Sequence, residues 1–174
     1  MNLLILTLLL TQVNAIPDGS LLFVEGGSEI VMNQTESPYS HVAVIFNDDG
    51  KPMVYEAVRP VVRKISLAEY IKQIEKDNIK KHKEMKLWLR KPKDLSKKDA
   101  ATMKEYCVKQ LGRKYRIKSY LSEQPESTIH CGELTTRTMI AGKMDAGVNA
   151  CIQVPKTIME FSSKWYQDKI RIYP

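Results

Sequence analysis

The sequence has few of the side chains that usually hold a metal: three cysteines and three histidines in 174 residues. No two cysteines lie two to four residues apart, as the ligand pairs of structural zinc sites do. The sequence therefore predicts neither a metal site nor a cofactor. An odd number of cysteines implies at least one free thiol in an exported protein. A disulfide between Cys107 and Cys151 is an alternative that the sequence leaves open.

The sequence also lacks an apolar run of transmembrane length. The most apolar stretch, Leu3 to Leu10, is far shorter than the ~20 residues that span a bilayer. Small residues follow at Val13-Asn14-Ala15, so residues 1–15 predict a secretory signal peptide, although no Lys or Arg precedes the apolar run. A buried N-terminal strand or helix is the alternative. With the signal removed, we expect residues 16–174 to form a single domain that is secreted or periplasmic.

Acidic residues are fewer than basic ones, and the formal net charge is +7. Much of this excess lies between Lys64 and Asp99, where twelve Lys or Arg stand against six Asp or Glu. This segment is interpreted as a solvated face, with attraction to an anionic cell wall or membrane surface as the sharper alternative. No motif that reads nucleic acid is visible, so nucleic acid is not an expected partner.

Hydrophobic patterning predicts strands first and helices grouped after them. Alternating or β-branched runs predict strands at 20–25, 40–46, 53–58, 61–65, 85–90 and 170–172. Capping residues and helical periodicity predict helices beginning at Ser66, Ser96, Cys131 and Val154. Residues 26–38 are expected to form a polar loop after Gly26-Gly27. This order favours an α+β fold with an antiparallel sheet packed against helices.

Cys131 is the strongest candidate nucleophile, because it begins an apolar helix. A helix N-terminus stabilises a thiolate, and its free N–H groups can bind the oxyanion of an acyl-transfer intermediate. Cys107 lies in the middle of a helical apolar stripe, which predicts a small core residue. Burial as a core thiol is also the simplest alternative for Cys131.

His41 is the best candidate for a base, since it opens a buried strand that can hold it rigidly. His82 lies among lysines on a solvated segment, and the ring of His130 is expected to point away from the adjacent Cys131. Glu56 lies on the next strand of a predicted hairpin and is the candidate for orienting His41. The alternatives are a strand-end histidine and an outward-facing glutamate.

Several stretches together resemble a known family. They are Gly19-Ser20-Leu21-Leu22-Phe23, Ser40-His41-Val42-Ala43-Val44-Ile45, Val54-Tyr55-Glu56-Ala57, Leu111-Gly112-Arg113-Lys114-Tyr115 and His130-Cys131-Gly132-Glu133-Leu134. In order and spacing these are similar to the circularly permuted papain-like cysteine hydrolases, the YiiX/YebB-like branch of the NlpC-type superfamily. The resemblance implies that fold, with Cys131 as nucleophile, His41 as base and Glu56 as the third polar residue. It departs from the family at Gly132, where the family's Cys-Ser-Glu-Leu stretch has Ser, and at Thr135-Thr136, where the family is more aliphatic.

The resemblance implies a cysteine hydrolase that cleaves an amide or related acyl bond, with a cell-wall peptide as one substrate. A second hypothesis is a lipid acyltransferase or thiol lipase similar to lecithin–retinol acyltransferase, although the Asn-Cys-Glu-His stretch typical of that group is absent. A third is a catalytically silent binding module on the same fold. The expected partner is a small peptide, amide or lipid substrate.

Overall fold

In a computed structural model of the protein, residues 16–116 and 127–173 are described. They form a six-stranded antiparallel sheet with the strand order β4-β3-β2-β1-β5-β6. The strands are β1 (Ser20–Glu25), β2 (Tyr39–Asp48), β3 (Lys51–Ala57), β4 (Val62–Ser66), β5 (Lys86–Arg90) and β6 (Ile170–Tyr173). The helices are α2 (Glu29–Thr35), α3 (Leu67–Lys81), α4 (Lys97–Gln110), α5 (Cys131–Ala141) and α6 (Pro155–Phe161), with short 3-10 turns η2 (Ala150–Ile152) and η3 (Ser162–Lys164). The predicted α+β fold is confirmed.

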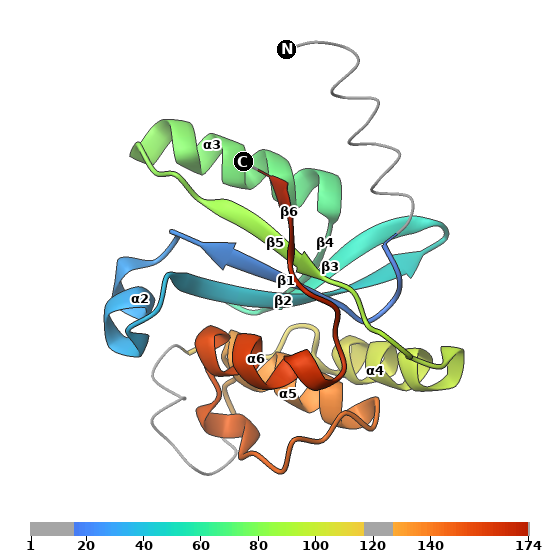
Figure 1. The fold of residues 1–174 in the computed structure, drawn as a ribbon. Coiled ribbons are helices and arrows are strands. Elements are labelled where there is room, and N and C mark those ends of the chain that lie inside the picture. Colours follow the sequence, from blue (N-terminus) through green and yellow to red (C-terminus); the bar gives the residue numbers. More distant parts are fainter. Residues whose placement is uncertain (1–15, 117–126, 174) are drawn as a thin grey trace.

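Helices cover both faces of the sheet (Figure 1). Helix α3 packs on one face, and α4, α5 and α6 pack on the other. Side chains of β2 alternate between the two cores, with Val42 and Val44 in one and Ala43 and Ile45 in the other. This explains why β2 is almost continuously apolar, because a strand buried on both faces has no solvent-facing side.

The helix boundaries follow their capping residues. The Ser66 side chain accepts a hydrogen bond from the Glu69 N–H, and the Glu69 carboxylate accepts one from the Ser66 N–H, which completes the predicted capping box at α3. Ser96 caps α4 in the same way, by accepting from the Asp99 N–H. Helix α5 begins at Cys131, where the sequence predicts it.

Two expectations about local structure change. The predicted polar loop between β1 and β2 contains helix α2, whose residues have no buried side chain to reveal it as amphipathic. The alternative disulfide does not form, because Cys107, Cys131 and Cys151 all carry free thiols. Cys107 is fully buried against Thr138, as expected for a core residue.

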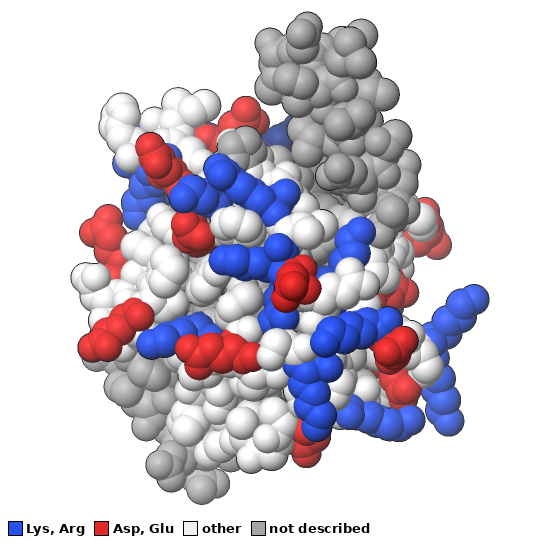
Figure 2. Space-filling view, in the orientation of Figure 1, with Lys and Arg blue, Asp and Glu red and all other residues white. Residues whose placement is uncertain are grey.

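In the view of Figure 2, lysine and arginine side chains are interspersed with acidic ones and form no uninterrupted basic patch. Several are paired, including Lys81 with Asp77 at 2.8 Å and Lys86 with Glu25 at 3.1 Å. Within the described ranges, no helix is long and apolar enough to cross a membrane. The predicted signal peptide lies outside the described residues.

Candidate active site

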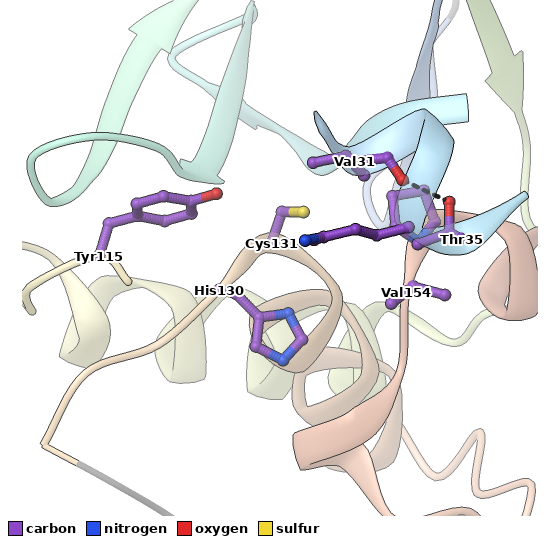
Figure 3. Close-up of a pocket in the computed structure, with 8 residues that line it drawn as sticks. Val31, Thr35, Tyr115, His130, Cys131 and Val154 are labelled. Atoms are coloured by element: carbon purple, nitrogen blue, oxygen red, sulfur yellow. Dashed lines mark hydrogen bonds between the residues drawn. The ribbon is translucent and has the colours of Figure 1, made fainter. Parts of the chain in front are cut away.

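Cys131 is the first residue of α5 and lies at the bottom of a small cleft. Its side chain is largely buried, with a residue exposure of 6%. Figure 3 shows the sulfur at the tip of the helix, between Tyr115 on one side and Val31 and Thr35 of α2 on the other. The N–H groups of the first helical turn, which have no carbonyl partner within the helix, are therefore close to the sulfur, where a negative charge is favoured.

His41 of β2 meets this thiol. The imidazole lies close enough to the Cys131 side chain for each to shift the pKa of the other. The Nε2 atom of His41 lies 2.7 Å from Oε2 of Glu56, which leaves Nδ1 for the sulfur. The ring therefore bridges a carboxylate and a thiol, the arrangement needed for a base that takes the thiol proton.

The two members of this pair stabilise each other in their charged forms. Burial alone would raise the pKa of Cys131, but the charge and hydrogen bonds of His41 and His130 lower it below the usual value of a thiol. Burial alone would lower the pKa of His41, but the Cys131 thiolate and the Glu56 carboxylate raise it. The arrangement therefore favours a thiolate–imidazolium pair, the reactive form of a cysteine nucleophile.

Glu56 of β3 reaches His41 because of the strand register. Val44 lies opposite Tyr55, so Glu56 and His41 lie one and three residues beyond this pair and share a face of the sheet. The carboxylate is buried, and its second oxygen, Oε1, accepts from Nε of Arg63 at 2.8 Å. Burial would raise the pKa of Glu56, but His41 and Arg63 lower it, so the carboxylate is ionised.

His130 is the N-cap residue of α5, and Figure 3 shows its ring directed away from the Cys131 sulfur, as the sequence suggests. Its Nδ1 accepts from the N–H of Glu133 at 3.3 Å and caps α5, while Nε2 lies 2.7 Å from the carbonyl of Cys151. These backbone partners occupy both ring nitrogens, so His41 remains the better candidate for moving a proton.

The cleft beside Cys131 is lined mainly by apolar side chains. Its lining residues are Val31, Gln34, Thr35, Tyr115, His130, Cys131, Val154 and Pro155. Tyr115 extends its hydroxyl toward the Cys131 side of the cleft (Figure 3). Tyr39 lies in the core with its ring edge against Phe23.

Sequence reasoning missed Arg63 and the wall formed by α2. Arg63 lies directly opposite Glu56 in the β3–β4 pair. Opposite charges on two consecutive predicted strands were a usable signal, because such residues can face each other when the strands pair. The α2 wall carried no comparable signal.

Comparison with known proteins agrees with this geometry. Residues 15–148 match the permuted papain-like amidase enzymes of the YaeF/YiiX, C92 family. The chain belongs to this family. The resemblance inferred from the sequence motifs is thereby confirmed, as is the permuted papain-like fold.

Among solved structures, this C92-family chain is similar to the metalloprotein YiiX from Escherichia coli O157:H7. The TM-score is 0.60 at 22% sequence identity, and the match covers 77% of this chain and 68% of that one. Among curated proteins, none matches the chain. In the part of this chain that the structure describes, no three or more His, Cys, Asp or Glu side chains gather as a metal site would require.

Proposed function

We propose that this C92-family chain is a cysteine hydrolase that cleaves an amide bond through Cys131, His41 and Glu56. The observation that carries the proposal is the arrangement of three side chains: the Cys131 thiol at the N-terminus of α5, His41 close enough to act on its charge, and the buried, ionised Glu56 at 2.7 Å from His41. Family membership supports hydrolytic chemistry of this kind.

The reaction begins with proton transfer from the Cys131 thiol to His41. The thiolate attacks the substrate carbonyl carbon, and the resulting oxyanion is stabilised by N–H groups at the start of α5. The C–N bond breaks as His41 returns the proton to the leaving amine, which leaves a thioester on Cys131. Water then attacks the thioester, with His41 as base, and releases a carboxylic acid and the free thiol. Glu56 stabilises the imidazolium in both halves of the reaction.

A cell-wall peptide is the substrate we place first, because the expected signal peptide would bring a basic protein to an anionic wall. The apolar lining of the cleft supports a second candidate, acyl transfer from or hydrolysis of a lipid. Val31, Val154 and Pro155 offer an uncharged wall to an acyl chain, whereas they offer no ionic partner to a charged peptide side chain.

One experiment tests the nucleophile without knowing the substrate. Residues 16–174 are treated with iodoacetamide near neutral pH, and labelling of the three cysteines is followed by peptide mass spectrometry. We expect Cys131 to react fastest and its rate to fall by at least about tenfold in His41→Ala, because the base no longer supports the thiolate. Equal rates at all three cysteines would refute the proposal.

A second experiment separates the two substrates. The protein and its Cys131→Ala variant are incubated with muropeptides and with phospholipid vesicles, and released amines and fatty acids are measured. Release from muropeptides that depends on Cys131 supports the amidase. If only fatty acid is released, the amidase proposal is wrong and the lipid reaction takes its place.

A further inference from the structure

Arg63 contacts Glu56 but takes no part in the proposed reaction steps. It extends from β4, and its Nε and NH2 nitrogens lie 2.8 and 2.6 Å from the same oxygen of Glu56, Oε1. The other oxygen, Oε2, lies 2.7 Å from His41. Each oxygen of the carboxylate therefore has its own partner.

Arg63 has a second partner besides Glu56. The Nη2 nitrogen that lies near Glu56 also donates to Oε1 of Gln73 on α3 at 2.9 Å. Arg63 lies opposite Glu56 in the β3–β4 ladder, so the strand register fixes its backbone as well. The guanidinium is thus held by Glu56, by Gln73 and by its place in the strand, and a planar group held in this way restricts rotation of the carboxylate it binds.

We propose that Arg63 is a positioning residue, which keeps Glu56 anionic and turns its Oε2 toward His41. The inference rests on the proposed function of Cys131 and His41. A buried carboxylate whose only partner is His41 loses its counter-charge whenever His41 gives up its proton, and it would then take up a proton more readily than a carboxylate that is also paired to a guanidinium. A protonated Glu56 no longer favours the imidazolium, and the reactive thiolate is then less populated.

The charged and titratable groups around Glu56 come from four elements. They are His41 from β2, Arg63 from β4, Tyr70 from α3, and Cys131 with the adjacent His130 from the start of α5. Tyr70 is buried and its pKa is raised well above its usual value, by burial first and by Glu56 second, so it is neutral. Arg63 is therefore the permanent positive charge in this set.

This role predicts a specific pH effect. With Arg63 removed, Glu56 takes up a proton at a higher pH than before. The acid limb, the low-pH part of the curve of Cys131 labelling rate against pH, therefore moves to higher pH. The labelling rate at neutral pH falls less than the rate on this limb. A purely structural role for Arg63 would lower reactivity at every pH alike.

The experiment measures iodoacetamide labelling of Cys131 against pH in residues 16–174 and in Arg63→Met. A matched control is Lys64→Met, which removes the neighbouring basic residue of β4, with a side-chain exposure of 38% against 36% for Arg63. We expect Arg63→Met to shift the acid limb upward by about one pH unit, a roughly tenfold loss of labelling on the acid side. Lys64→Met should leave the limb in place, since Lys64 pairs with Asp48 at 2.9 Å.

Two further measurements keep the inference testable if Arg63→Met folds poorly. Arg63→Lys should show a smaller shift in the same direction, because it keeps the charge but loses the fork. Guanidinium ion added to Arg63→Ala, well below denaturing concentrations, should restore part of the acid-side labelling. The role of Arg63 would be overturned if the acid limb stayed in place in Arg63→Met and Arg63→Lys. It would also be overturned if the limb moved as far in Lys64→Met as in Arg63→Met. If His41→Ala labels as fast as the unchanged protein, the proposed function fails instead, whatever Arg63 does.

Discussion

Gly132, the second residue of α5, lies directly against the backbone of the segment that follows η2. A Cβ atom built on Gly132 would lie 1.9 Å from the carbonyl oxygen of Gln153 and 3.2 Å from Cα of Val154. The close approach involves backbone, so it cannot be relieved by turning a side chain. Glycine at this position therefore lets the chain pack against the helix turn that carries Cys131.

We predict that Gly132→Ala lowers the free energy of unfolding by about 1–3 kcal/mol, the usual cost of overpacking a tight site. It should also slow labelling of Cys131, because the first turn of α5 must shift. Urea unfolding and iodoacetamide labelling measure the two effects. Gly27→Ala is the control, since a Cβ there first meets the Ser40 hydroxyl, a side-chain group that can rotate away. Equal costs for the two variants would contradict this account.

Two threonines of α5 bury hydroxyl groups without a hydrogen bond. The Oγ1 atoms of Thr135 and Thr136 find no partner among the residues described. One turn on, the Thr138 hydroxyl donates to the carbonyl of Leu134 at 2.7 Å. The three residues have the same shape and comparable burial, so they differ mainly in hydrogen bonding.

Thr135→Val should therefore stabilise the protein by about 1 kcal/mol, because it removes an unsatisfied buried hydroxyl without changing the volume much. Thr138→Val should destabilise it by about the same amount, since it removes a hydrogen bond that is made. Thermal unfolding of the two variants measures the difference. A loss of stability in both would mean that the Thr135 hydroxyl is bonded in solution.

At the scale of single residues, sequence reasoning could predict side chains whose chemistry is scarce. Only three cysteines and three histidines had to be ranked, and strand and helix patterns favoured Cys131 and His41. The contacts of His130 could not be predicted in this way, because its capping bond depends on the extended backbone of the N-cap residue. The catalytic roles of Cys131 and His41 are predictions that the labelling experiment tests.

At the scale of elements, Arg90 at the end of β5 holds the C-terminal segment. The guanidinium is buried and donates to the carbonyls of Gln167 and Met159 at 2.9 and 2.8 Å and to the Ser162 hydroxyl at 2.7 Å. These acceptors belong to α6, η3 and the connection to β6, so a single side chain fixes the chain around the end of the helical layer.

We expect Arg90→Met to lower the free energy of unfolding by roughly 3 kcal/mol, because it leaves several buried acceptors without a donor. Limited proteolysis should cut the variant first after α6. Arg171→Met is the matched control, since Arg171 is exposed on β6 and its Nε donates only within its own strand, to Tyr173. A comparable loss in the control would contradict the anchoring role of Arg90.

Most elements could be predicted because local signals and the fold agree. Capping residues gave the starts of α3 and α4, and period-two alternation gave β5. Helix α2 could not be predicted, because it has seven residues, no buried side chain and no capping hydrogen bond from Ser28. It is held by tertiary packing on β2, a contribution that local propensity does not contain.

At the scale of the whole molecule, ionised carboxylates tie the sheet together. Glu25 pairs β1 to Lys86 of β5, Asp48 joins β2 to Lys64 of β4 and to α4, and Glu56 links β3 to β2 and β4. Burial would raise the pKa of each carboxyl, but the paired cations and hydrogen bonds lower it. Each of these groups therefore binds a proton less readily in the folded chain than in the unfolded one.

The sign of the pH effect follows from this difference. Carboxyl groups with a lowered folded pKa stabilise the protein fully above their unfolded values of about 4, and that contribution is lost as the pH falls through the folded values. We predict that the contribution of these carboxylates to the free energy of unfolding is kept from about pH 7 to 5 and is then lost toward pH 3, so that the protein loses stability over the lower range, measured by urea unfolding at each pH. In Asp48→Asn the protein should be less stable near pH 7 and the decline toward acid shallower, because one titrating group is gone. If the decline is as steep as that of the unchanged protein, protonation of Asp48 does not contribute to the loss of stability in acid. The loss then comes from Glu25 and Glu56.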